Sequence, residues 1–533
     1  MCGIHVYLAD SPQDEPLAQM VASATHRGPD HSAQQSLTVP SGWLGMGANR
    51  LMISDRSPAS HQPMAGPDGS WLVYNGELYN AFELRNELLQ LGNITFTTAS
   101  DTEVLLHALK QWGPAVIPRL NGMFAFAFWH GEKQELWLAR DPVGIKPLYW
   151  TDTKTGRMYS SEVRALSAGL GQPLLPDTQE LTPLLAQRYP KVTGYPEVHA
   201  LPPGTYHRWS AQHGEFESVR YSPPRDKSPS EDPKNPPPQL KELLTDALLR
   251  QSEAQVPMGM FLSGGVDSTL LLALQQEEGI PRLPAFTVAH RKEDQRFGTR
   301  DGEYAEQAAK QYRTTVDALE VTPKVLDRFP EYIQAMDVPL GDSGGLLTWL
   351  LAERAKAQGF GVVLSGAGAD ELFAGYHRLA AYQRYLRRPE FWHRTGPLLR
   401  RLSPLLPTAK GIPGRAYFQL LRKFAQRIGA HPAETWRRFQ GLTLPPEAEG
   451  YYQEQAEATN WLAWAYCQDQ EGYLPKQVLA LSDTFTMAHG LELRVPYLDA
   501  DLVAWAQQLP AEFPQGGPQY AEQTCTAAGS KHD

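Results

Sequence analysis

The sequence predicts a chain of mixed α/β and α+β class in two domains, the second built on a doubly wound parallel sheet. Three observations lead to this fold class. The 533 residues exceed what one hydrophobic core usually organises. A proline-rich stretch over residues 222–239, poor in apolar residues, separates the two halves as a linker. Beyond the linker, short apolar runs alternate with helical patterns, as they do in parallel sheets.

Composition narrows the function classes. Hydrophobic residues make up 42% and charged residues 20% of the chain, as in soluble globular proteins. A net charge of -10 argues against a general binder of nucleic acid or of a lipid surface. No apolar run reaches membrane-spanning length, and no signal-peptide pattern opens the sequence. Three cysteines cannot form a disulfide framework, so we expect a protein of the reducing cytoplasm. The net charge and the short apolar runs lead us to expect no membrane and no nucleic-acid partner.

A glycine-rich turn organises the second half. The apolar run 258–262 predicts a buried strand, and the apolar-rich run 269–275 predicts a helix. Gly264 and Gly265 stand between them and let the backbone come close to a ligand. Because the helix offers unpaired N–H groups and a positive dipole end, the turn is predicted to hold an anion.

Polar side chains in the same turn indicate which anion. Ser263 and Ser268 add hydroxyl donors, whereas Asp267 would repel bare phosphate and therefore indicates a divalent metal between carboxylate and ligand. The turn lacks the lysine of P-loop nucleotidases. Ser-Gly-Gly-x-Asp-Ser instead resembles the pyrophosphate loop of ATP pyrophosphatases, which implies ATP as substrate, cut between its α- and β-phosphates.

A second glycine-rich turn, Ser365–Tyr376, follows an apolar run at 361–364 and contains Asp370. Helices at 240–251 and 301–309 and strands at 284–288 and 316–321 complete the alternation. In doubly wound sheets the carboxyl ends of neighbouring strands share one crevice. Both turns should then face the same ATP, with Asp267 and Asp370 as Mg²⁺ ligands.

The other informative residue lies at the start of the chain. Removal of Met1 would leave Cys2 with a free α-amine. The reference pKa values of about 8 for the amine and 8.5 for the thiol allow the amine to act as base for its own side chain. Cys2 is therefore a candidate nucleophile, whereas an isolated cysteine elsewhere would be read as a core residue.

Further motifs follow Cys2 in a fixed order. They are His26–Asp30, Asn49–Leu51, Tyr74–Asn80, Ser100–Glu103, Asn121–Phe128, Ala139–Asp141, Gly144–Tyr149 and Ser161–Glu162. Together they resemble the class II glutamine amidotransferase domain over roughly residues 2–200. The resemblance implies an N-terminal-nucleophile glutaminase, with two sheets packed between helices in an αββα sandwich, as the domain 1–210.

This resemblance implies a role for each matching residue. Cys2 would be the nucleophile, and the Asn75 side chain and Gly76 N–H would form the oxyanion hole. Arg50 would bind the α-carboxylate of glutamine as a bidentate fork. The α-ammonium group would be held by two further residues, Asp101 and Glu77.

With Leu491–Asp499 added, the second half resembles the synthetase domain of the glutamine-hydrolysing asparagine synthetase family. The resemblance implies a synthetase domain over 240–533 with helical additions to its sheet. It places Leu262, Val288, Ser365 and Gly366 around the adenosine. Glutamine, aspartate and ATP would be the small-molecule partners, and a homodimer is expected.

The implied reaction is glutamine-dependent asparagine synthesis. Ammonia released at Cys2 would pass through an internal channel to a β-aspartyl-AMP and yield asparagine, AMP, pyrophosphate and glutamate. Two alternatives stay open. In the first, the acceptor is a carboxylate other than aspartate, because neither motif set identifies the acceptor. In the second, the C-terminal half binds nucleotide but no longer amidates.

Several residues depart from the family pattern. Ala367 stands where the family often has an acidic residue. The family has a lysine downstream of Asp499, but here no Lys or Arg lies between Arg494 and Lys531, so the synthetase domain is expected to be short at its C-terminus and weak. Lys476 is the candidate replacement. Residues 378–440 carry many arginines, which predicts the solvated face of a helical insertion rather than nucleic-acid binding.

Overall fold

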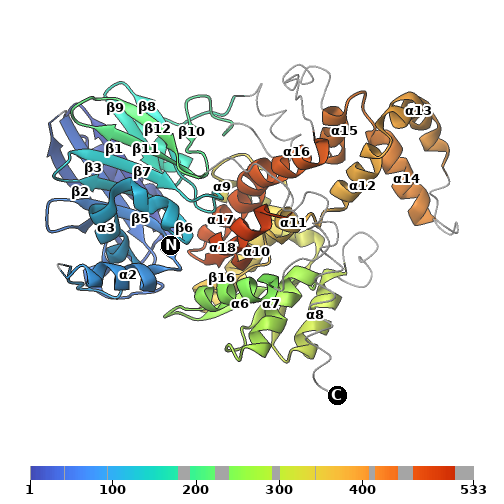
Figure 1. The fold of residues 1–533 in the computed structure, drawn as a ribbon, viewed down its shortest axis with the longest axis horizontal. Helices are drawn as coiled ribbons and strands as arrows, with labels where there is room; N and C mark the ends of the chain where they lie inside the picture. Colours follow the sequence, from blue (N-terminus) through green and yellow to red (C-terminus); the bar gives the residue numbers. More distant parts are fainter. Residues whose placement is uncertain are drawn as a thin grey trace.

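The computed structural model shows two domains side by side (Figure 1). It describes residues 2–40, 42–92, 94–177, 193–222, 239–290, 300–342, 344–406, 415–441 and 460–509. Nearly all of the predicted linker, and the whole segment 510–533 with Lys531, lie outside these residues. In the described part of the chain, no helix combines the length and apolar character needed to cross a bilayer.

The N-terminal domain contains two antiparallel six-stranded sheets. The first has the order β10-β8-β9-β1-β3-β2, with β1 Cys2–Ala9, β2 His31–Val39, β3 Gly42–Arg50, β8 Tyr149–Thr153, β9 Gly156–Ser160 and β10 His199–Ala200. The second has the order β12-β11-β7-β6-β5-β4, with β4 Met64–Ala65, β5 Trp71–Leu78, β6 Gly122–His130, β7 Glu135–Arg140, β11 Thr205–Ser210 and β12 Phe216–Arg220. The second sheet therefore continues beyond residue 210.

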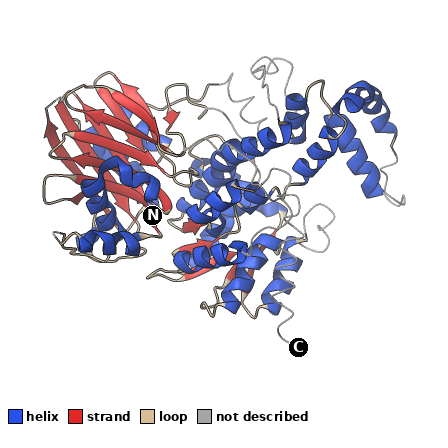
Figure 2. Ribbon diagram, viewed as in Figure 1, coloured by secondary structure: helices blue, strands red, loops and turns tan. Residues whose placement is uncertain are grey.

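Alternation along the strands builds a four-layer sandwich (Figure 2). Phe124, Phe126 and Phe128 of β6 face helices α2 (Ala81–Gln90) and α3 (Asp101–Trp112). The residues between them face the first sheet. Helices α1 (Asp14–Ser23) and α4 (Val163–Leu170) cover the outer face of that sheet. The predicted αββα arrangement is confirmed.

The second domain is built on a five-stranded parallel sheet of order β15-β14-β13-β16-β17. Its strands are β13 Met258–Phe261, β14 Ala285–His290, β15 Val316–Val321, β16 Val362–Leu364 and β17 Glu492–Arg494. The chain runs outward from β13 to β15 and then returns to β16 on the other side. The order therefore reverses between β13 and β16, which confirms the doubly wound prediction.

Helices surround this sheet and extend the domain. Those interleaved with the strands are α6 Gln239–Gln251, α7 Val266–Glu277, α8 Asp301–Gln311, α9 Phe329–Ala335 and α10 Gly344–Ala357. The additions are α11 Ala369–Phe373, α12 His377–Leu386, α13 Pro389–Leu402, α14 Arg415–Arg427, α15 Pro432–Phe439, α16 Trp461–Gln468, the π-helix η7 Asp469–Leu479, α17 Ala480–Met487 and α18 Ala500–Gln507. The predicted helical insertion thus includes α12 to α15.

Buried ion pairs join the two domains. Asp483 of α17 accepts from Arg27 at 2.8 Å and from Lys146 at 3.3 Å. Arg27 also pairs with Glu162 at 3.1 Å. All four side chains are at most 4% exposed. Burying a charge is costly unless it is paired, so these contacts fix how the domains lie against each other.

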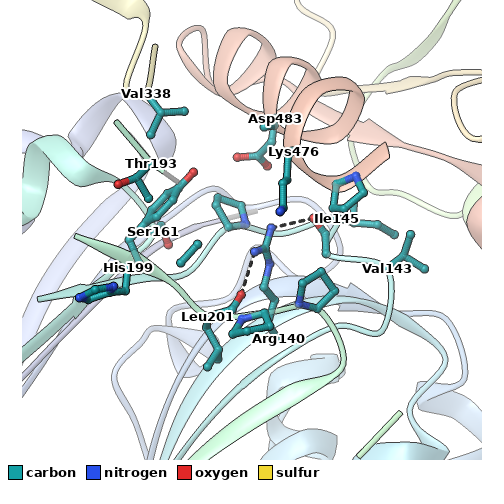
Figure 3. A pocket seen from close by; sticks show the side chains of 18 of the residues that line it. Arg140, Val143, Ile145, Ser161, Thr193, His199, Leu201, Val338, Lys476 and Asp483 are labelled. Carbon is teal, nitrogen blue, oxygen red and sulfur yellow. Dashed lines mark hydrogen bonds between the residues drawn. The ribbon is translucent and has the colours of Figure 1, made fainter. Parts of the chain in front are cut away.

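A cavity of about 470 Å³ opens beside these pairs, between the domains (Figure 3). Arg140 and Ile145 line it from the N-terminal domain, and Lys476 and Asp483 line it from the second domain. Lys476, the predicted replacement for the family lysine, therefore faces this interdomain cavity.

Each domain also caps a helix of the other. Both Asp337 carboxylate oxygens accept N–H groups at the start of α4, from Val163 at 2.7 Å and Arg164 at 2.9 Å. In return, Asn121 accepts from the Ala500 N–H at the start of α18 at 3.3 Å. These caps satisfy N–H groups that a helix start leaves unpaired.

We expect Asp483→Ala to lower the free energy of unfolding by about 3–5 kcal/mol, because it removes the carboxylate that pairs with the buried Lys146 and leaves the buried Arg27 with Glu162 alone. Urea unfolding of the full chain measures this. The matched control is Asp317→Ala, which removes an exposed ion pair with Arg354 and should cost less than about 1 kcal/mol. Equal losses in the two variants would show that the interdomain pairs do not hold the domains together.

Candidate functional site

Cys2 begins β1 and is buried. Its backbone nitrogen donates to Asn75 Oδ1 at 3.0 Å, and Gln62 Nε2 lies 3.9 Å from its Sγ. Burial raises the pKa of the Cys2 thiol, and the positive charge of nearby Arg50 partly opposes this rise. The thiol at the start of β1 therefore lies among hydrogen-bonding and charged groups that could act on a substrate.

Asn75 and Gly76 are residues of β5, and Asn75 lies beside Cys2. Asn75 Nδ2 is buried and has no hydrogen-bond partner among the described residues. A buried unpaired donor is costly, so its presence beside the candidate nucleophile Cys2 is consistent with the predicted oxyanion hole. Gly76 is required sterically, because a Cβ there would lie 2.1 Å from the Met123 carbonyl oxygen. Alternation along β5 directs the Gly76 N–H to the same sheet edge as that of Tyr74, which donates to Gln62.

Arg50 ends β3, and the following loop holds its guanidinium. One terminal nitrogen donates to the Ser57 carbonyl and to His61 Nδ1, each at 2.9 Å, and the other donates to the Asp55 carbonyl. Burial lowers the pKa of Arg50. The side chain is thus fixed near Cys2, with the remaining N–H groups of a five-donor fork available for a carboxylate.

Two carboxyl groups complete this end of the site. Asp101 opens α3 and accepts from the Leu78 N–H at 3.0 Å. Glu77 accepts from the Ser54 hydroxyl and lies 3.7 Å from Arg494. Burial raises the pKa of Glu77 to about 8, and the negative charge of Asp101 adds to the rise. A substrate cation between the two carboxyls would offset this repulsion.

Arg494 touches both halves of the molecule. Its side chain is buried, pairs with Glu492 at 2.6 Å and donates to the Glu253 carbonyl at 2.6 Å. Its own carbonyl accepts from the Ser365 N–H at 2.9 Å. One residue therefore links the Glu77 carboxyl to the second glycine-rich turn. The sequence placed Arg494 in a motif but did not reveal this contact.

The first glycine-rich turn is held by its own hydroxyls. Ser263 Oγ accepts from the Gly265 N–H at 3.2 Å and lies 3.1 Å from Ser268 Oγ. Gly264 has a φ of +72°, and a Cβ there would lie 2.3 Å from the Ala305 nitrogen of α8. Glycine is therefore required both for the backbone conformation and for the close approach.

The second turn lies against the first, as predicted. A Cβ on Gly366 would lie 3.1 Å from the Ser268 nitrogen and 3.3 Å from the Asp267 Cβ. The Tyr497 hydroxyl donates to the Asp267 carbonyl at 3.1 Å, so the C-terminal motif supports the same place. Leu262 directly follows β13, and Val288 lies in the neighbouring β14. The predicted nucleotide residues thus gather at the carboxyl ends of adjacent strands.

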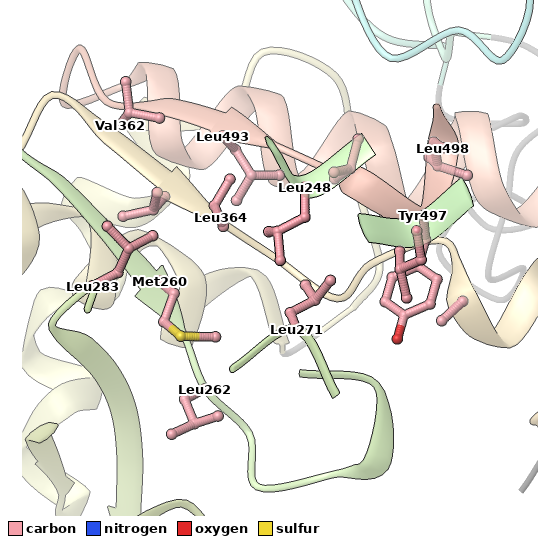
Figure 4. Close-up of a cluster of buried hydrophobic side chains, with 14 of the residues drawn as sticks. Leu248, Met260, Leu262, Leu271, Leu283, Val362, Leu364, Leu493, Tyr497 and Leu498 are labelled. Carbon is pink, nitrogen blue, oxygen red and sulfur yellow. The ribbon is translucent and has the colours of Figure 1, made fainter. Parts of the chain in front are cut away.

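A shared core fixes these turns (Figure 4). Leu262 and Leu271 bracket the first turn and are buried with Leu364, Leu493 and Leu498 in one cluster. These side chains come from β16, β17 and the C-terminal motif as well as from the turn. Packing at this density leaves the turns little freedom to separate.

Asp267 and Asp370 lie close enough to repel each other. Burial and the charge of Asp370 raise the pKa of Asp267 to about 7, and burial raises that of Asp370. Two partly buried carboxylates at the paired turns fit a divalent cation. The described residues contain no cluster of three or more metal-ligating side chains. Mg²⁺ is often held by one or two carboxylates together with substrate phosphates, so the pair suffices.

One cation beside Asp370 was not predicted. Arg378 of α12 stacks on Tyr376 at 3.7 Å and on Tyr473 at 4.6 Å, and it pairs with Asp469 at 3.0 Å. Its positive charge opposes the rise in the Asp370 pKa. The sequence signal that could have identified Arg378 is its position two residues after Tyr376, the end of the second turn. Ala367 donates its N–H to Ser365 Oγ at 3.2 Å and contributes no charge.

Comparisons with known proteins agree with this geometry. Residues 1–222 match the family model described as a glutamine amidotransferase domain, and residues 239–517 match the model described as asparagine synthase. A Mycobacterium tuberculosis protein named provisionally as asparagine synthetase (glutamine-hydrolyzing) is 33% identical, over 96% of this chain and 82% of its own length. Asparagine synthetase (glutamine-hydrolyzing) 1 of Bacillus subtilis is 27% identical over the same shares. Amidase chyE of Penicillium rubens is 27% identical, over 91% of this chain and 77% of its own.

We expect Asp267→Asn to stabilise the metal-free protein at pH 8 by roughly 1–2 kcal/mol. The pKa of Asp267 is about 7 in the folded chain and near 3.9 when unfolded, so the folded state binds more protons between these values. Stability contributed by the protonated group is therefore present at pH 4 and lost as pH rises through 7.

Thermal unfolding in EDTA at pH 5 and pH 8 measures the effect. The gain from Asp267→Asn should be larger at pH 8. Asp246→Asn, an exposed change on α6, should show no such dependence. A gain that is equal at both pH values would contradict the repulsion between Asp267 and Asp370.

Proposed function

We propose, since the chain belongs to the asparagine synthase family, that it makes asparagine from aspartate and ATP with ammonia taken from glutamine. The observation that carries this proposal is the link through Arg494. It connects Glu77, beside the nucleophile Cys2, to Ser365 of the paired glycine-rich turns. A glutamine site and a nucleotide site joined in this way suit a reaction in which one supplies the other.

At the first site, the Cys2 thiolate attacks the side-chain carbonyl of glutamine. A free α-amine on Cys2 takes the thiol proton. Asn75 Nδ2 and the Gly76 N–H donate to the oxyanion, which explains why the buried Asn75 amide lacks a partner. Collapse expels ammonia and leaves a thioester, which water hydrolyses to glutamate. Arg50 holds the α-carboxylate, and Asp101 and Glu77 hold the α-ammonium.

At the second site, the β-carboxylate of aspartate attacks the α-phosphate of ATP and pyrophosphate leaves. Ammonia then attacks the acyl carbon of the aspartyl-AMP, and AMP leaves with the bonding electrons. Ser263, Ser268 and the N-terminus of α7 donate to the pyrophosphate. Leu262, Val288, Ser365 and Gly366 form the adenosine pocket. The ammonia reaches this site through an internal channel between the domains.

Mg²⁺ fits the Asp267 and Asp370 carboxylates, and when bound it neutralises charge on the ATP phosphates. The same carboxylates alone would repel ATP, so their burial at a phosphate-binding turn favours this assignment. The free thiol on which the first step depends favours the reducing cytoplasm. A homodimer is the assembly that we expect.

The acceptor distinguishes this proposal from its alternatives. The relative named Amidase chyE and the neutral Ala367 favour testing other carboxylates. The experiment supplies ATP, Mg²⁺ and glutamine with a panel of carboxylic acids, and follows pyrophosphate and amide. Amide formed from aspartate alone supports asparagine synthesis. Amide formed only from another acid, or glutamine hydrolysis without amide, would overturn it.

We expect Cys2→Ala to abolish glutamine hydrolysis, because no other group can form the thioester. Pyrophosphate release and amide formation should persist when ammonium chloride replaces glutamine, since the second site is separate. The matched control is Cys467→Ala, which changes a cysteine of the helical additions and should leave glutamine hydrolysis intact. Glutamine hydrolysis by Cys2→Ala would remove the nucleophile assignment.

We expect Asp370→Asn to lower ATP-dependent pyrophosphate release by at least about 10²-fold, the usual scale for removing one group that stabilises transition-state charge. Glutamine hydrolysis should stay within about threefold of the unaltered chain, because Asp370 lies in the other domain. Isothermal titration of Mg²⁺-ATP should show weaker binding. The reverse pattern, with hydrolysis lost and pyrophosphate release kept, would refute the assignment of the two sites.

A further inference from the structure

Helices α12 to α15 form an arm, residues 377–441, that carries the outer helices α13 and α14 at the end of the molecule remote from the N-terminal domain (Figure 1). The arm contains 12 Arg and 2 Lys against 2 Glu and no Asp, a net charge of +12. The whole chain carries -10, so the rest of the molecule carries -22. The whole-chain charge, on which the expectation of no membrane partner rests, therefore conceals one projecting part with a net positive charge.

Five arginines of the arm are exposed. They are Arg384, Arg387, Arg388, Arg394 and Arg401. The structure gives no ion pair to any of them, although other surface arginines in the described chain, such as Arg354, do pair with carboxylates. Their charge is thus directed to solvent rather than used within the fold.

An apolar stripe runs along the same helix as Arg394 and Arg401. Phe391, Leu398, Leu402 and Leu405 are 51%, 60%, 47% and 79% exposed. Their spacings of seven, four and three residues place them on one face of α13 and of the 3-10 turn that continues it, η5 (Ser403–Leu405).

This stripe is not the face that packs on the arm itself. Trp392 meets Phe424 of α14 at 5.1 Å between ring centroids, and Gly396 lies against Ile428. Both contacts lie on a different side of α13 from the stripe. The helix therefore has one apolar face buried within the arm and a second one exposed beside arginines.

We propose that the stripe on α13 and its flanking arginines form a peripheral docking surface for an anionic lipid bilayer. The leucine and phenylalanine side chains enter the boundary between headgroups and acyl chains, and the guanidinium groups bind lipid phosphates. The acidic remainder of the molecule is repelled from the same bilayer, so the arm alone makes contact.

The combination of exposed apolar and cationic side chains favours a lipid bilayer over other anionic partners. Nucleic acid presents phosphates but no hydrocarbon, and it would leave four exposed apolar side chains without a partner. A second copy of this chain presents an acidic surface. Its carboxylates would pair with the arginines, but they would leave the apolar stripe on the helix without a partner. A bilayer offers phosphate and hydrocarbon along one plane, which matches both features.

The test is sedimentation of the full chain with vesicles of phosphatidylglycerol and phosphatidylcholine in equal parts. The unaltered chain should bind these vesicles, bind pure phosphatidylcholine vesicles at least about tenfold more weakly, and lose most binding in about 0.5 M NaCl. Absence of binding, or equal binding to both vesicles, would overturn the proposal.

Two variants separate the contributions. L398E/L402E removes exposed apolar groups and should weaken vesicle binding at least about tenfold, and R394E/R401E should do so at low salt. Leu175→Glu, which changes an exposed leucine of the N-terminal domain, should bind as the unaltered chain does. Equal thermal unfolding of all variants confirms that they fold.

Three further outcomes would overturn the proposal. L398E/L402E could bind vesicles as well as the unaltered chain does. The same variant could instead abolish self-association seen by analytical ultracentrifugation without lipid, which would assign the stripe to a second copy. Binding of a short DNA duplex that depends on Arg394 and Arg401, with no vesicle binding, would assign the arm to nucleic acid.

Discussion

The pairing of Asp483 with Arg27 and Lys146 is the interaction on which the rest of the molecule depends. These three charges from two domains lie buried together with Glu162, which also pairs with Arg27, so that each charge has a partner of opposite sign. The domains therefore share one arrangement rather than a range of orientations. Because Arg27 Nε also donates to the Cys2 carbonyl at 3.3 Å, the same cluster fixes the start of β1, where the proposed nucleophile Cys2 lies.

At each of the two candidate sites, polar groups lack the partners that a ligand could supply. Among the described residues, Asn75 Nδ2 lacks a hydrogen-bond partner, and the negative charge of Asp370 raises the pKa of Asp267. Groups left unsatisfied inside an otherwise well-paired fold are typical of sites completed by a ligand. Under the proposed function, an oxyanion would satisfy the Asn75 amide, and a metal–phosphate pair would satisfy the Asp267 and Asp370 carboxylates.

The sequence predicted the local parts of this fold well. Alternation over Phe124–Phe128 identified a strand, and glycines at 264 and 366 identified two turns, the first of which has no room for a Cβ. Those signals arise because neighbouring residues share a strand, a helix or a turn. They sufficed to predict both turns and the crevice that they share.

Contacts between distant segments could not be predicted in the same way. Arg27 and Asp483 lie 456 positions apart, and nothing in the periodicity around either residue indicates the other. The contact of Glu77 with Arg494 and the position of Arg378 beside Asp370 depend on how helices pack, not on local pattern. The linking role of Arg494 therefore became visible only in three dimensions.

The reciprocal caps at α4 and α18 have a consequence for how the chain responds to cutting. Asp337 completes a helix of the N-terminal domain, and Asn121 completes one of the second. Each of these two helices therefore has an N–H group whose partner lies in the other domain. A protease that severs the chain between Ser222 and Gln239 would thus yield two fragments that stay associated through gel filtration. They would separate only when the whole molecule denatures.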